Sequence, residues 1–269
     1  MAKNVEITLP TKPRSKWTLI KRIITLIIIV WIYIWTISSV TIKWDVIFSS
    51  RTMENFDRII PRFFQPAWQE TSSIFGKMFE TIFIAYTGSL AAAVLAVPLA
   101  FLCATNIVRN KFLNNIGMWI LGAVRAFPEI ILAIIFVAAV GPNAFAGVLA
   151  IAIGSTGMLG KLYAEVIESI DMDIMEALEA SGANKLQILF YGILPQVLPE
   201  FLSYAIYRFE IDVRASSVLG IVGAGGIGTL ITFAYMNRNW EEVGMILLVI
   251  IITVTIIDQI SGFIRKRLV

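Results

Sequence analysis

The sequence predicts an all-α membrane protein with about six transmembrane helices. Of its 269 residues, 58% are hydrophobic and only 15% are charged, and the mean hydropathy is +0.80. Soluble globular domains are more polar than this. Apolar runs long enough to cross the hydrocarbon core of a bilayer recur along the chain. We expect the six spans at residues 23–40, 78–104, 118–140, 144–162, 201–221 and 243–263.

The composition also excludes several classes of function. The chain has no histidine, which removes the commonest metal ligand and the commonest catalytic base. Its single cysteine, Cys103, cannot form an intrachain disulfide. The formal charge of +3 comes largely from residues near the two ends, and no basic face with interleaved aromatic residues suggests a nucleic-acid partner. We therefore expect membrane lipid around the chain, and no catalytic, cofactor or metal site within it.

The two ends of the chain predict its orientation. Six basic residues precede the first span: Lys3, Lys12, Arg14, Lys16, Lys21 and Arg22. Three more, at residues 265–267, follow the last. Because basic residues stay on the cytoplasmic side, both termini are expected in the cytoplasm of a multi-pass protein of the cytoplasmic membrane. The first apolar run is too long for a cleaved signal peptide and lacks a clear cleavage site, so we interpret it as an anchor.

The chain divides into two segments on this interpretation. Residues 1–75 form an N-terminal cytoplasmic segment, the first span and an external loop, and residues 76–269 form the core. Within the core, Arg109 and Lys111 mark an internal loop, and residues 141–143 (Gly-Pro-Asn) an external turn. The fourth span has a face of small residues suited to helix contact: Ala146, Ala150 and Gly154.

Residues 165–196 form a polar interruption between the fourth and fifth spans. A helical stripe of apolar residues, with Asp173 and Glu176 as a capping pair, predicts a short amphipathic helix that Gly182 ends. Asn184 and Gln187 repeat the capping spacing for a second short helix that Pro195 closes. A hairpin resting on lipid is one interpretation. However, residues 165–180 hold six acidic side chains and no basic one, which favours docking of a cytoplasmic protein.

The fifth span carries four charged residues at bilayer depth. Arg208 with Asp212, and Glu210 with Arg214, are pairs of opposite charge at i, i+4 spacing, and they lie on nearly opposite helix faces. Both pairs therefore cannot line one pore, and a third pair, Arg125 with Glu129 in the third span, is a candidate partner for one of them. Ion pairs that lock helices together are the favoured interpretation. In the alternative, the guanidinium groups of Arg125, Arg208 and Arg214 attract an anion in transit.

Two glycine-rich strings mimic nucleotide-binding motifs. Residues 154–161 (GSTGMLGK) have the wrong glycine spacing for a phosphate-binding loop and lie in an apolar span. Residues 223–228 fit G-x-G-x-x-G, but no strand-helix-strand unit surrounds them. We interpret the second string as a flexible or re-entrant turn at the membrane edge, and expect no nucleotide site in this chain.

The polar interruption resembles a signature of ATP-binding-cassette (ABC) importer permeases. Five residues stand at the spacing of its Glu-Ala-Ala, Gly and Leu-Pro elements: Glu176, Ala177, Gly182, Leu194 and Pro195. Leu178 and Gly192 depart from the pattern. The flanking segments resemble the phosphonate transporter permeases in particular, at residues 125–129, 159–165, 195–204 and 213–228. This resemblance covers residues 76–265.

The resemblance implies a type I ABC importer permease fold with a cytoplasmic coupling helix. The residues that would dock the ATPase are Glu176, Ala177, Glu179, Gly182, Leu194 and Pro195. The residues that would line the substrate pathway are Arg125, Glu129, Arg208, Glu210, Asp212 and Arg214. The chain would break no covalent bond itself. It would pair with a second copy, with cytoplasmic ABC ATPase subunits that bind ATP and Mg, and with an extracytoplasmic phosphonate-binding protein.

Two alternatives remain open for the function. The imported solute would be phosphonate, phosphite or a phosphate ester if the chain follows the subfamily, or methionine or another small solute if it follows only the class. A protein of a different class, an ATP-independent secondary transporter, would need neither ATPase nor binding protein. The sequence shows no internal repeat that would support such a transporter.

Overall fold

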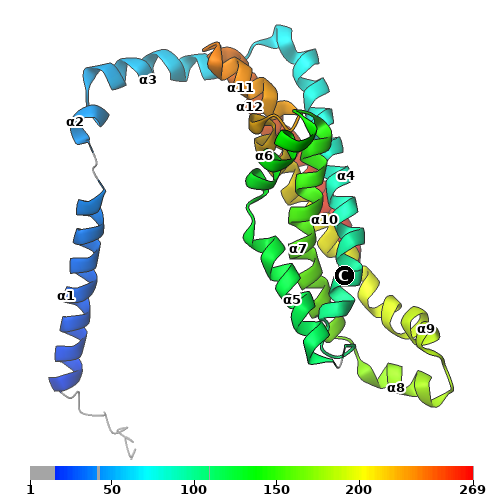
Figure 1. Cartoon of the computed structure of the whole chain (residues 1–269). Helices are drawn as coiled ribbons and strands as arrows, with labels where there is room; N and C mark the ends of the chain where they lie inside the picture. Colours follow the sequence, from blue (N-terminus) through cyan, green and yellow to red (C-terminus); the bar gives the residue numbers. More distant parts are fainter. Residues whose placement is uncertain (1–15, 41–42, 109, 269) are drawn as a thin grey trace, which may run out of the picture. The chain divides into compact units, whose positions relative to one another are not determined.

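The computed structural model describes residues 16–40, 43–108 and 110–268, in which every regular element is a helix (Figure 1). This confirms the all-α class. The basic residues Lys3, Lys12, Arg14 and Arg109, which were used to predict orientation, lie outside the described residues. The α-helices are α1 (Lys16–Ser39), α2 (Trp44–Ile47), α3 (Ser50–Phe63), α4 (Thr71–Cys103), α5 (Lys111–Ala126), α6 (Glu129–Val140), α7 (Ala144–Glu168), α8 (Met172–Ala180), α9 (Lys185–Gln187), α10 (Leu194–Leu219), α11 (Ile227–Met236) and α12 (Trp240–Leu268).

The chain forms two compact units, residues 1–57 and 58–269, which are described separately. In the first unit, α1 covers the predicted first span, and its side chains from Trp17 onward are exposed. Trp31 stacks on Trp35 with ring centroids 6.1 Å apart. A helix that is apolar on all sides suits a lipid environment.

The second unit is a helical bundle in which α4 contacts α5, α7 and α10, and α7 also contacts α5, α6 and α10. Small buried residues let these helices approach closely: Ala92, Ala96 and Ala100 on α4, and Ala146 and Ala150 on α7. At Gly88 of α4, an added Cβ would lie 2.7 Å from the side chain of Ile151 on α7. The small-residue face predicted on the fourth span is therefore a packing face.

The third predicted span is not one straight helix. It consists of α5 and α6, which meet at an angle of 83°. Phe127 adopts an extended conformation (φ −84°, ψ 121°) because the ring of Pro128 disfavours helical geometry in the preceding residue. Five helices are long and apolar enough to cross a membrane, and this bent pair makes a sixth crossing if it is one span. The predicted number of about six agrees with this, and the predicted third span is bent at Phe127 and Pro128.

The glycine-rich turn at residues 223–228 is packed inside the unit. Gly223, Gly225 and Gly226 have positive φ values, which suit glycine, and residues 224–228 are buried. The backbone N–H of Gly226 donates to Oε1 of Glu80 over 3.1 Å, and that of Ile227 to Oγ1 of Thr81 over 2.7 Å. These bonds tie the start of α11 to α4. The turn is thus held against α4 by hydrogen bonds and is largely buried.

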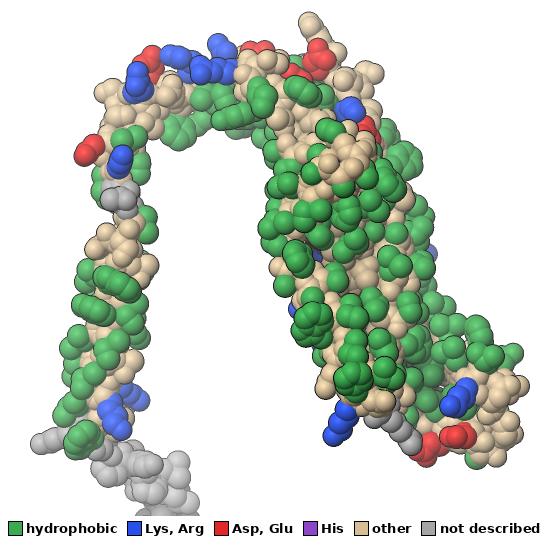
Figure 2. All heavy atoms as spheres, viewed as in Figure 1, with side chains coloured by type: hydrophobic (Ala, Val, Ile, Leu, Met, Phe, Trp, Pro, Cys, Tyr) green, Lys and Arg blue, Asp and Glu red, His purple; other side chains and the backbone are tan. Residues whose placement is uncertain are grey.

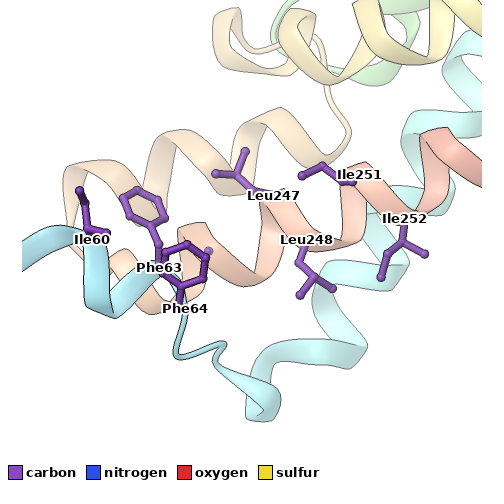
Figure 3. A pocket seen from close by; sticks show the side chains of 8 residues that line it. Ile60, Phe63, Phe64, Leu247, Leu248, Ile251 and Ile252 are labelled. Carbon is purple, nitrogen blue, oxygen red and sulfur yellow. The ribbon is translucent and has the colours of Figure 1, made fainter.

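An apolar groove of about 570 Å³ lies between the end of α3 and α12 (Figure 3). Ile60, Phe63 and Phe64 line one side, and Leu247, Leu248, Ile251 and Ile252 line the other. Phe63 also packs on Trp240, with ring centroids 5.8 Å apart. A Cβ on Gly244 would lie 2.3 Å from the carbonyl oxygen of Phe63. The backbone at the end of α3 therefore crosses α12 at a glycine, where no side chain blocks the contact. This crossing fixes the segment that leads into α4.

Candidate functional site

The polar interruption folds as a hairpin of α8 and α9, which projects from one end of the bundle (Figure 1). The Asp171 side chain caps α8 by accepting a bond of 2.9 Å from the backbone N–H of Asp173. The predicted cap, Asp173 with Glu176, is wrong because α8 already begins at Met172. Gly182 ends the first arm with φ +84°, as predicted, and donates to the carbonyl of Glu179 over 2.9 Å.

The second arm of the hairpin leads into a membrane helix. Asn184 and Gln187 form the predicted capping box, with bonds of 2.7 and 2.9 Å. A π-helix then runs from Ile188 to Ile193 and passes directly into α10. Pro195 lies in the first turn of α10, so the prediction that it closes the second helix is wrong. Proline lacks a backbone N–H, and the wide π-turn before it accommodates the missing hydrogen bond.

Polar contacts fasten the base of the hairpin to the bundle. The side chain of Gln196 accepts from the backbone N–H of Asp171 over 3.0 Å and donates to the carbonyl of Gly192 over 2.8 Å. Glu168, near the other end of the loop, accepts two bonds of 2.8 Å from Thr105, just after α4. Neither Gln196 nor Glu168 was predicted as a site residue, although both lie in the polar interruption at residues 165–196. A Cβ on Gly192 would lie 2.9 Å from Leu178, so this departure from the signature lets the two arms pack together.

The tip of the hairpin combines carboxylates with exposed apolar side chains. Five of the six residues predicted to dock a partner are exposed (Glu176, Ala177, Glu179, Gly182 and Pro195), and Leu194 is half-buried. Exposed apolar side chains accompany them: Ile174, Leu186, Phe190 and Tyr191. Acidic side chains at this end of the molecule are visible in Figure 2. Such a surface suits contact with a protein better than contact with anionic lipid.

A second group of functional side chains, the central charge cluster, lies inside the bundle and consists of Glu129, Ser155, Arg208 and Asp212. Nε of Arg208 lies 2.9 Å from Oδ1 of Asp212 and donates to Oγ of Ser155 over 2.9 Å. Another nitrogen of the same guanidinium pairs with Glu129. Ser155 lies 2.9 Å from both carboxylate oxygens of Asp212, which is completely buried. The cluster ties α6, α7 and α10 together near the middle of α7 and α10.

Three glycines of α7 make room for the bent pair α5 and α6. A Cβ on Gly154 would lie 2.8 Å from Glu129, one on Gly157 would lie 2.9 Å from Arg125, and one on Gly160 would lie 2.6 Å from Leu121. The i, i+3 spacing of these glycines puts them on one helix face. Gly157 was noticed only as part of a false phosphate-binding motif, whereas Gly154 was assigned to the small-residue face and Gly160 to a segment of the family resemblance. The i, i+3 spacing of three glycines was the signal in the sequence from which a groove for a closely packed helix could have been predicted.

The other charged pair of α10 faces α12. Arg214 pairs with Glu210 and with Oδ1 of Asp258, 2.9 Å away, and Arg265 lies 3.2 Å from Oε2 of Glu210. The two pairs of α10 thus meet different helices, in agreement with the prediction that they cannot share one pore. Asp258 and Arg265 were not predicted to take part.

Arg125 does not form the pair that its spacing predicts. It lies at the end of α5, whereas Glu129 begins α6 after the bend, so the two residues do not share a helix face. Glu129 pairs with Arg208 instead. Among the described residues, no carboxylate lies within salt-bridge distance of Arg125, and its side chain is exposed.

Comparison with known proteins places these features in context. A family model, described as the binding-protein-dependent transport system inner membrane component, matches residues 96–269. The chain is 43% identical over 190 residues to the phosphite transport system permease protein PtxC of Stutzerimonas stutzeri, covering 71% of this chain and 69% of that protein. It is 42% identical over 121 residues to a protein of Escherichia coli (strain K12) named, provisionally, as the cryptic phosphonate transport system permease protein PhnE2, covering 45% of this chain and 99% of that protein.

A solved structure shares the fold. The chain superposes on the MetNI methionine ABC transporter in an inward-facing conformation with a TM-score of 0.65 and 23% sequence identity. The match covers 73% of this chain and 96% of that chain. At this identity the likeness concerns the architecture alone.

Proposed function

Because the chain belongs to the family of binding-protein-dependent transport system inner membrane components, we propose that it imports phosphonate, phosphite or a related phosphate ester. A member of this family is a permease subunit of an ABC importer and not an enzyme. It works with an ATPase and a solute-binding protein, which removes the ATP-independent secondary transporter from consideration. The observation that carries the choice of solute is the similarity to the phosphite permease over most of the chain.

Methionine is the other solute to consider. The methionine transporter of the solved structure shares 23% sequence identity with this chain, lower than the 43% shared with the phosphite permease. Phosphonate and phosphite are anions of similar shape, and one permease pathway would accommodate both. The phosphorus oxyanions are therefore the proposed class, and the binding protein would select among them.

The hairpin of α8 and α9 is the proposed docking element for the ATPase. Its tip exposes Glu176, Ala177 and Glu179, while its base is fixed by Gln196 and Glu168. The second arm continues without interruption into α10, which carries the pair Arg208 and Asp212 and the pair Glu210 and Arg214. A movement of the hairpin would therefore be transmitted along one continuous helical segment to the middle of α10.

The remaining parts of the proposal concern assembly. Two copies of the chain would enclose the path, and a pair of cytoplasmic ATPase subunits would bind ATP and Mg. Both termini would lie in the cytoplasm, and the binding protein would deliver the anion from the opposite side. Basic residues 265–267 at the end of α12 support this orientation.

Uptake into proteoliposomes tests this proposal. The permease, its ATPase and its binding protein should accumulate labelled phosphite or methylphosphonate only when ATP and all three components are present. Omission of the ATPase or the binding protein provides the control, and labelled methionine provides the competing solute. Uptake of methionine without uptake of any phosphorus oxyanion would contradict the proposal.

A further inference from the structure

Arg125 lies against the middle of α7, and it is near the midpoint of residues 111–140 if the bent pair of α5 and α6 is one membrane span. Its Cγ and backbone N lie against Gly157, about halfway along α7. Ser155, on the neighbouring turn of α7, binds Arg208, which is itself near the middle of α10. Arg125 and Arg208 thus lie against neighbouring turns of α7, at a similar height in the bundle.

The two arginines of α10 are already paired with carboxylates. Arg208 pairs with Glu129 and Asp212, and Arg214 pairs with Glu210 and Asp258. Arg125 has no such carboxylate among the described residues, and its side chain is exposed. A charged side chain in hydrocarbon is costly, so an exposed arginine at mid-depth faces a protein interior or a water-filled path.

The bend next to Arg125 independently points to a polar environment. No side chain caps α6, and within the described chain the backbone N–H groups of Glu129 and Ile130 have no protein acceptor. Irregular backbone at membrane depth is tolerated where it is buried in protein or lines a water-filled cavity. The bend therefore presents backbone donors beside an unpaired guanidinium, which is a combination that attracts an oxyanion.

We propose that Arg125 contacts the phosphorus oxyanion while it crosses the membrane, and that Arg208 and Arg214 hold helices together. This assignment rests on the proposed function. In a symmetric dimer, two copies of Arg125 would be available to one doubly charged anion. The fork of donors on each guanidinium matches the oxygens of phosphite and phosphonate.

Substitution of Arg125 in the complete transporter tests this assignment. Arg125→Gln should lower ATP-driven uptake of labelled phosphite by about tenfold or more, because a charge-assisted hydrogen bond is lost. Folded yield and ATPase activity stimulated by the binding protein should stay near those of the wild type. Arg125→Lys should restore part of the uptake. Lys111→Gln, which removes a cation from the first turn of the same helix, is the matched control and should transport normally.

The outcomes separate this assignment from the proposed function. Normal uptake by Arg125→Gln would overturn the assignment alone. Loss of folded yield in both Arg125→Gln and Arg125→Lys would also overturn it, because Arg125 would then have a structural partner, such as a carboxylate of the second copy. Failure of the wild-type complex to take up any phosphorus oxyanion would overturn the proposed function and the assignment with it.

Discussion

Arg208 joins α6, α7 and α10 through its contacts. Its guanidinium meets Ser155, Glu129 and Asp212, and almost none of its side chain is exposed. A buried ion pair adds little net stability, but removal of one partner leaves an uncompensated charge in a low-dielectric interior. Asp212, which is completely buried, would be left with only the hydroxyl of Ser155.

Replacement of Arg208 by alanine should therefore destabilise the fold. We expect Arg208→Ala to lower the free energy of unfolding by about 3 kcal/mol and to reduce the yield of monodisperse protein. Thermal unfolding in detergent would measure the loss. Arg214→Ala is the control, because 47% of that side chain is exposed and its removal should cost about 1 kcal/mol or less. Unchanged stability of Arg208→Ala together with lost anion uptake would instead assign Arg208 to the substrate pathway.

Residue spacing predicted some of these contacts and not others. The i, i+4 rule identified the pairs on α10 because Arg208, Asp212, Glu210 and Arg214 share one unbroken helix. The same rule failed for Arg125 because Pro128 breaks the helix between it and Glu129. Contacts between distant segments, such as Arg214 with Asp258, leave no local pattern in the sequence.

Hydrogen bonds fix the hairpin of α8 and α9 to the bundle at the base of both arms. Gly182 sets the angle between the arms, since its φ of +84° is a conformation that β-branched side chains avoid. The space around Gly182 is open, so a substitution there strains the backbone without a steric clash. The effect of such a substitution would be confined to the shape of the hairpin.

Gly182→Val should uncouple transport while leaving the protein in the membrane. A backbone strain of about 1–2 kcal/mol, if relieved by a change in the elbow, would weaken docking by about tenfold. ATPase activity stimulated by the binding protein, measured in the assembled complex, should fall by a similar factor. Gly262→Val on α12 is the control, because a side chain there also meets open space and the backbone is helical. Full stimulation of ATPase activity in Gly182→Val would argue against a role in docking.

Helix type and approximate position were predictable from apolar periodicity, but helix ends and breaks were less so. Gly182 and the capping box of α9 were predicted because their chemistry is local. The start of α8, the continuation through Pro195 and the short α11 depend on packing within the bundle. The glycine groove of α7 was visible in the sequence as Gly154, Gly157 and Gly160, but only the structure shows which helix fills it.

At the scale of the whole assembly, the bend between α5 and α6 should face the second copy if the proposed path lies between two subunits. The chain offers a simple way to examine this, because its single cysteine, Cys103, is buried. Phe127→Cys would add one exposed thiol at the bend. A bifunctional maleimide should then link two permease chains, visible as a doubled mass on a denaturing gel.

The matched control places the new thiol elsewhere on the surface. The control variant is Ile251→Cys on α12. The wild-type Ile251 side chain is 64% exposed and lines the apolar groove of Figure 3. The control variant should give no linked product, and neither should the wild-type chain. Linking through residue 251 but not through residue 127 would put the dimer contact on the wrong face for the proposed path.

The bend between α5 and α6 also has a consequence for the biogenesis of the protein. At 1.5 Å per residue, α5 spans about 24 Å and α6 about 18 Å, and neither reaches across a hydrocarbon core of about 30 Å. The ribosome delivers both before α7, whose glycines hold the bend. We therefore expect residues 111–140 to enter the bilayer as one hydrophobic segment, in which Pro128 breaks the helix and the later packing of α7 fixes the angle. On this expectation, insertion of this part of the chain precedes its final packing.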